Sequence, residues 1–94
     1  MTTSVLVTHV HGELRFSEVV SCTEAALNAV LFDFNPSSNH DVTAIKAMCA
    51  GIIQKMRDHQ AKADTPPEQK RVAAIAITQM ELAQMAAVKA LFAK

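Results

Sequence analysis

Aromatic side chains are scarce in this sequence, which has four phenylalanines and neither tryptophan nor tyrosine. Glycine is also rare, at two residues, and neither stands in a glycine-rich phosphate loop. The only cysteines, Cys22 and Cys49, form no C-x-x-C pair. We therefore expect little irregular backbone, no disulfide framework, and two reduced thiols packed in an apolar core.

Net charge is absent as well, because nine basic side chains balance nine acidic ones. A protein that binds a nucleic-acid polymer usually has a basic excess, since phosphate neutralisation supplies most of its affinity. A small ligand with a few phosphates needs only a few local cations, so neutrality does not exclude one. No stretch reaches the ~20 apolar residues of a membrane span, and residues 1–11 have no basic n-region. We expect a cytoplasmic protein without a membrane partner.

Signals of catalysis are also missing. The serines stand in no G-x-S-x-G context, and no serine or cysteine has a recognisable base and orienting group. His9 and His11 lie two residues apart on an expected strand and could share a metal, but no third ligand has a suitable spacing. A strand end near a turn explains them better. The sequence predicts no enzyme activity, no cofactor and no metal site.

The 94 residues are enough for a single domain, and half of them are hydrophobic. Residues 4–10 and 13–20 are rich in β-branched residues and partly alternating, which predicts two paired strands with a turn at Gly12. The segment 23–34 is ambiguous, because its first half favours helix and its second half favours strand. We expect a third strand ending near Phe34, so that residues 1–34 form N-terminal strands.

Apolar residues then recur every three or four positions from Val42 to Met56, which predicts a helix over residues 40–60. Asn39 or Ser38 can cap it. Thr65 with two prolines and Glu68 resembles a capping box that starts a second helix over residues 66–92. The predicted fold is α+β: a small N-terminal antiparallel sheet followed by a two-helix antiparallel hairpin.

The second helix is apolar on almost every side, and one partner helix with a small sheet cannot cover it. Self-association into a homo-oligomer is therefore expected. At 100° per residue, Arg71, Thr78 and Lys89 fall on one line. Such a stripe either lines a pocket or faces solvent, and periodicity alone leaves both open.

The turn Phe34-Asn-Pro-Ser37 also has two interpretations. Phe34 can be a core residue and Asn35 a turn former, which the residues alone favour. Alternatively, an exposed aromatic ring near Lys46 offers a face for a nucleobase and a positive charge for phosphate.

Two segments together resemble a known domain. Phe34-Asn-Pro-Ser-Ser-Asn-His-Asp-Val-Thr-Ala-Ile-Lys46 and Arg71-Val-Ala-Ala-Ile-Ala-Ile-Thr-Gln-Met-Glu-Leu-Ala-Gln-Met-Ala-Ala-Val-Lys-Ala90 resemble the helical-hairpin domain shared by two phage anti-defence families. These are the Thoeris anti-defence sponges and the anti-CBASS cyclic-oligonucleotide sponges. The resemblance covers about residues 32–92. The strands before the turn favour the anti-Thoeris branch.

The resemblance implies a protein that sequesters a cyclic nucleotide immune signal, such as a cyclic ADP-ribose isomer or a cyclic di- or trinucleotide, without degrading it. It implies pockets between protomers of a homodimer or homohexamer in the bacterial host cytoplasm. The residues that it assigns to ligand binding are Phe34 and Asn35 beside base and ribose, Lys46 and Arg71 at phosphate, and Thr78 as a hydroxyl.

Two positions depart from this pattern. Ala86 stands where many relatives have an aromatic residue, which weakens a stacking role near Met85. Ile77 stands where some have arginine, which weakens a trinucleotide site. The alternative function is a structural oligomer that binds no small ligand.

Overall fold

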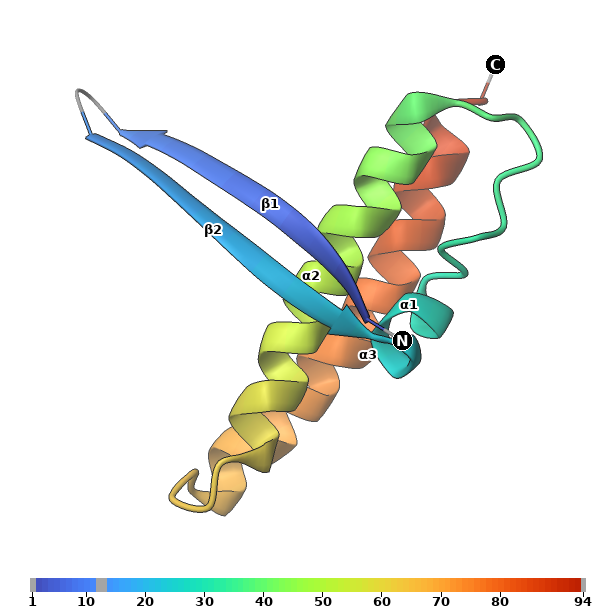
Figure 1. Cartoon of the computed structure of the whole chain (residues 1–94). Coiled ribbons are helices and arrows are strands. Elements are labelled where there is room, and N and C mark those ends of the chain that lie inside the picture. Colours follow the sequence, from blue (N-terminus) through green and yellow to red (C-terminus); the bar gives the residue numbers. More distant parts are fainter. Residues whose placement is uncertain (1, 12–13, 94) are drawn as a thin grey trace.

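The computed structural model describes the backbone of residues 2–11 and 14–93, and the side chains of Ser4 and of residues 21–93. Its elements, in chain order, are β1 (Thr2–His11), β2 (Leu14–Thr23), α1 (Glu24–Ala29), α2 (His40–Ala61) and α3 (Pro67–Ala90). Figure 1 shows α2 and α3 side by side, with the two strands forming a ribbon that extends away from them.

The ribbon confirms the predicted strand pair. β1 and β2 are antiparallel, with Val5 opposite Val20 and Val7 opposite Glu18. The β-branched residues that fill both strands suit this pleated backbone. The turn predicted at Gly12 and the side chains of His9 and His11 lie outside the described residues.

The helical hairpin is also confirmed, although one of its two predicted caps is wrong. Asn39 caps α2 as expected, because its Oδ1 accepts the backbone N–H of Asp41 at 2.8 Å. Thr65 does not cap α3. Its hydroxyl instead donates to the carbonyl of His59 in the last turn of α2 at 2.6 Å, and this carbonyl also accepts the backbone N–H of Lys62 at 3.4 Å. Pro66 precedes α3 without a side-chain cap.

The third strand predicted to end near Phe34 is wrong: the segment after β2 forms α1 and a tight turn. Ala26 and Val30 are buried whereas Asn28 between them is exposed, which matches one face of a helix, because in a strand all three would lie on the same face. The β-branched and aromatic residues after Ala29 do not extend β pairing, because the backbone reverses there. Leu31 has a φ of 51°, in the left-handed region.

The core lies where α1 and the end of β2 pack against the hairpin. Its fully buried side chains come from β2, α1 and α2, namely Cys22, Ala26, Val30, Ala50 and Ile53. Ile77 of α3 belongs to the same cluster and is 9% exposed. Phe32 and Met80 pack against this cluster from the turn and from α3. α1 therefore covers one side of the hairpin and leaves much of the outer surface of α3 in solvent.

Cys22 gives this core a pH dependence. Burial raises the pKa of its thiol, and the nearby negative charge of Asp58 raises it further. The neutral thiol is thus favoured in the folded state, so the stability that it contributes is present below the ordinary thiol pKa of about 8.5. That stability is lost as the pH rises through the higher, folded value. Urea unfolding should show a free energy that falls between pH 8 and 10, with a smaller fall in Cys22→Ala. An equal fall in both proteins would contradict this assignment.

Candidate ligand-binding site

Phe34 stands on a turn that presents its ring to solvent. The turn ends α1 in a Schellman arrangement: the Phe32 N–H donates to the Leu27 carbonyl and the Leu31 N–H to the Asn28 carbonyl. Leu31 occupies the left-handed position that glycine usually fills. The side chain of Phe34 is 65% exposed. A shallow hollow of about 190 Å³ lies over this turn, lined by Leu27, Asn28, Leu31, Phe32, Asp33 and Phe34.

Lys46 is buried beneath the same turn. Its side chain is only 4% exposed. The ammonium donates to the carbonyl of Leu31 at 2.8 Å and to the carbonyl of Phe34. It also lies 5.7 Å from the centroid of the Phe34 ring, within cation–π range. The structure therefore brings Phe34 and Lys46 together, with the lysine inside the protein.

Asn35 organises the loop that leads into α2. Its Nδ2 donates to the Asn39 carbonyl at 2.9 Å and to the Thr43 hydroxyl at 3.1 Å, and its Oδ1 accepts from Ser37 at 2.8 Å. Both polar atoms of the side chain thus have partners in the loop or in the first turn of α2. In this conformation Asn35 fixes the backbone next to Phe34.

Arg71 lies apart from the turn that carries Phe34, on the surface of the first turns of α3. It forms a two-point ion pair with Glu68, in which Nε donates to Oε2 at 3.0 Å. This hydrogen bond lowers the pKa of Glu68 and raises that of Arg71. Both side chains are more than three-fifths exposed. The pair therefore holds the guanidinium in place in a high-dielectric setting, where an exposed ion pair is weak and a stronger anion can displace Glu68.

Thr78 shares a surface hollow with Arg71. This hollow measures about 460 Å³ and is lined by Arg71, Ala74, Ile75, Thr78 and Gln79. The Thr78 hydroxyl donates to the Ala74 carbonyl at 3.2 Å, so its oxygen lone pairs face outward as acceptors. The hollow thus combines a cation, an acceptor and an apolar floor.

These residues form two groups in a single chain. His59 contacts Gln69 across the hairpin at 2.8 Å, which sets the register of α2 against α3. With a rise of about 1.5 Å per residue, Lys46 and Arg71 then lie roughly 16 Å apart along the hairpin axis. Moreover, Arg71 and Thr78 lie on the face of α3 that points away from its core-facing Ala73 and Ile77.

Gln54 makes three partly buried polar contacts that the sequence does not predict. Gln54, 5% exposed, accepts from the backbone N–H of Thr23 at 2.9 Å and from its hydroxyl at 3.0 Å, and donates to Asp58 at 2.8 Å. It ties the end of the β ribbon to α2. A glutamine inside an apolar helix face is the signal that could have revealed this anchor.

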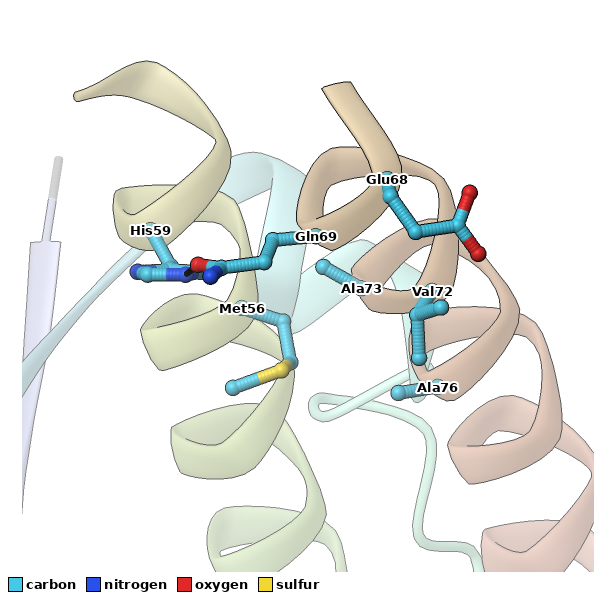
Figure 2. A pocket seen from close by; sticks show the side chains of 7 residues that line it. All are labelled: Met56, His59, Glu68, Gln69, Val72, Ala73 and Ala76. Atoms are coloured by element: carbon cyan, nitrogen blue, oxygen red, sulfur yellow. Dashed lines mark hydrogen bonds between the residues drawn. The ribbon is translucent and has the colours of Figure 1, made fainter. Parts of the chain in front are cut away.

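A third hollow, which is an open groove, lies at the end of the hairpin where α2 and α3 are joined (Figure 2). It measures about 380 Å³ and is lined by Met56, His59, Glu68, Gln69, Val72, Ala73 and Ala76. Figure 2 shows His59 and Gln69 meeting between the two helices, while Glu68 points away from α2. Apart from its rim the groove is apolar, and it contains neither Phe34 nor Thr78.

Among the side chains that the structure describes, those of Ser4 and of residues 21–93, no group of three or more His, Cys, Asp or Glu is placed to hold a metal ion. Within the same part of the chain, no helix is both long and apolar enough to cross a membrane.

Comparison with known proteins gave one family. The model of the family described as "Acb2/Tad1, hairpin domain" matches residues 24–92, which is most of the chain and includes α1, α2 and α3. Neither curated proteins nor solved structures gave a significant match. Phe34, Asn35, Lys46, Arg71 and Thr78 all lie within the matched residues.

Proposed function

Because this chain belongs to the Acb2/Tad1 hairpin-domain family of anti-defence cyclic-nucleotide sponges, we propose that it binds and sequesters a cyclic nucleotide immune signal without degrading it. The ligand class is a cyclic ADP-ribose isomer or a cyclic di- or trinucleotide. The β ribbon that precedes the matched residues supports the anti-Thoeris branch and hence a cyclic ADP-ribose isomer.

The chemistry of the proposal rests on one observation. The chain holds the exposed ring of Phe34 and the exposed guanidinium of Arg71 in fixed positions. The Phe34 ring offers a stacking face for a nucleobase, and stacking is worth about 1–3 kcal/mol per base. The planar fork of Arg71 can donate two hydrogen bonds to a phosphate. The outward lone pairs of Thr78 can accept from a ribose hydroxyl or a base amino group.

The pocket forms between copies of the chain in this proposal. One chain leaves its two groups of ligand-binding residues on different sides, so a second copy is needed to bring Phe34 near Arg71. Large apolar side chains on the outer surface support this assembly. Met48, Ile52, Val72, Ile75, Leu82 and Met85 are each more than two-fifths exposed.

The surface of α3 has the pattern of a helix that packs on another helix. Ile75, Leu82 and Lys89 repeat every seven residues, and Arg71, Thr78 and Met85 repeat between them. Alternating spacings of four and three are typical of a helix–helix seam. Because Arg71 and Thr78 belong to this line, a partner that covers Leu82 also borders their hollow. A homodimer, or a homohexamer built from dimers, satisfies both requirements.

Sequestration requires affinity and copy number but no chemistry, because a bound signal cannot reach its effector. The family is known for ligand binding and not as enzymes. In this proposal Arg71 and Thr78 hold the ligand, and no residue transfers a proton or forms a covalent bond.

Incubation followed by recovery tests the proposal directly. The purified protein is mixed with a cyclic ADP-ribose isomer or with 3′,3′-cyclic di-AMP, free ligand is removed by gel filtration, and the protein is then heat-denatured. Sequestration predicts that intact ligand elutes by reverse-phase chromatography after denaturation. New nucleotide products would contradict it and indicate a degrading enzyme.

A structural oligomer without a ligand is the second candidate. It is favoured by one observation, which is that Asn35 and Lys46 already have protein partners. In that case neither the unaltered protein nor Arg71→Ala would bind a cyclic nucleotide.

A further inference from the structure

Lys46 is an unusual cation in this fold. Its side chain is only 4% exposed. Among the described residues, no salt bridge joins it to a carboxylate. A buried charge is costly unless it is hydrogen-bonded or paired. Its hydrogen bonds go to two backbone carbonyls, those of Leu31 and Phe34.

Those carbonyls belong to a turn whose own backbone hydrogen bonds include the Schellman pair and a bond from the Phe34 N–H to the Leu31 carbonyl at 2.9 Å. Leu31 has a φ of 51°, a conformation that costs an L-residue roughly 1–2 kcal/mol. The side chains of Leu31 and Phe34 are 62% and 65% exposed, so they contribute little burial in a single chain. Lys46 adds a contact from α2 to this turn, because its ammonium donates to the carbonyls at both ends of residues 31–34.

We infer that Lys46 is a positioning residue, whose buried ammonium fixes the turn over residues 31–34 and thereby presents the Phe34 ring to the ligand. We call the contact of the Lys46 ammonium with the Leu31 and Phe34 carbonyls the latch. The inference rests on the proposed function for the role of Phe34, but the latch itself is a property of the free protein. It differs from the phosphate contact expected for Lys46 from the sequence. To reach a phosphate, the ammonium would have to leave both carbonyls.

Positioning raises affinity because it removes a cost of binding. A ring that is already fixed does not lose conformational freedom when a base stacks on it, and each immobilised side chain otherwise costs about 0.5–1.5 kcal/mol. The ammonium lies 5.7 Å from the ring centroid on the inner side. The opposite face of the ring is thereby left to a base.

The latch can be tested without any ligand. The sequence has no tryptophan, so Phe34→Trp introduces a single fluorescent probe on the turn. Adding Lys46→Met to this variant removes the ammonium and keeps the aliphatic chain. We expect lower fluorescence anisotropy and about twofold stronger acrylamide quenching than in Phe34→Trp alone. Lys62→Met, at an exposed lysine in the hairpin turn, is the matched control and should change neither value. Unchanged anisotropy and quenching in a folded Lys46→Met protein would overturn the inference.

A second measurement covers the case in which Lys46→Met does not fold. In the unaltered protein, NMR should detect an ammonium cross-peak for Lys46 that exchanges slowly with water, with hydrogen-bond couplings to the carbonyl carbons of Leu31 and Phe34. Exchange as fast as that of surface lysines, without these couplings, would overturn the latch.

A double-mutant cycle then separates positioning from phosphate contact. Affinity for the ligand that binds best is measured for Lys46→Met, Phe34→Ala and the double variant. If Lys46 acts through Phe34, the double variant binds no more weakly than the weaker single variant. Multiplying fold-losses would show an independent phosphate contact and contradict the inference. If the unaltered protein binds no cyclic nucleotide, the proposed function fails, whereas the fluorescence and NMR results still decide the latch.

Discussion

Replacing Leu82 with glutamate is expected to convert the proposed homo-oligomer into single chains. Leu82 is 58% exposed in one chain and lies at the centre of the line formed by Ile75, Thr78, Met85 and Lys89. Burying a leucine contributes about 1.5–3 kcal/mol, and a twofold interface loses this contribution twice. A buried carboxylate without a partner adds a further penalty. Dimer affinity should therefore fall by at least about a thousandfold.

Analytical ultracentrifugation measures this change, with Ala63→Glu as the matched control. Ala63 is exposed in the turn between α2 and α3, so the same charge there should leave the mass unchanged. Leu82→Glu should also abolish ligand binding, because the pocket needs residues from two copies. Full ligand affinity in a monomeric Leu82→Glu protein would show that one chain contains the whole site.

Replacing Arg71 with alanine is expected to lower ligand affinity at least about thirtyfold with little effect on folding. The side chain is 62% exposed and its described hydrogen bonds go to Glu68, which is itself exposed, so its loss leaves that carboxylate in water. In the complex it would meet a desolvated phosphate. Removing one member of such a pair usually costs 2–5 kcal/mol, which corresponds to about thirtyfold or more. Isothermal titration calorimetry gives the change directly.

Two variants control for charge and for the existing ion pair. Lys70→Ala removes the same charge from the neighbouring exposed position and should leave affinity nearly unchanged. Glu68→Gln releases Arg71 from its carboxylate partner and should leave affinity equal or raise it. If Lys70→Ala weakened binding as much as Arg71→Ala, a general field of positive charge would explain the affinity without a specific phosphate contact.

The sequence predicts the helical hairpin well because its signals are long and local. The apolar period from Val42 to Met56 extends over several turns, and Asn39 provides the expected cap. The segment after Thr23 is different. Its conformation depends on Leu31 in a left-handed position and on Lys46 from α2, and a propensity summed along the chain contains neither contact.

The sequence predicts which candidate residues share a surface better than it predicts the partners of their side chains. Arg71 and Thr78 share a helical face by spacing alone, and the structure places them at one hollow. The partners of Asn35 and Lys46 could not be read from spacing, because they are backbone carbonyls and hydroxyls that the turn and the start of α2 bring close. Glu68 was predicted as part of a helix cap and instead pairs with Arg71, since both side chains lie one turn apart on the same surface.

A thermal-shift titration against a panel of cyclic ADP-ribose isomers, cyclic dinucleotides and cyclic trinucleotides tests the central claim most directly. A ligand present at 100 times its dissociation constant stabilises the fold by about 2.7 kcal/mol. For a domain of this size, that corresponds to a rise in Tm of about 10 °C or more. We predict such a rise with one class of cyclic nucleotide, and its loss in Arg71→Ala. An unchanged Tm with every member of the panel would contradict the account of this protein as a cyclic-nucleotide sponge.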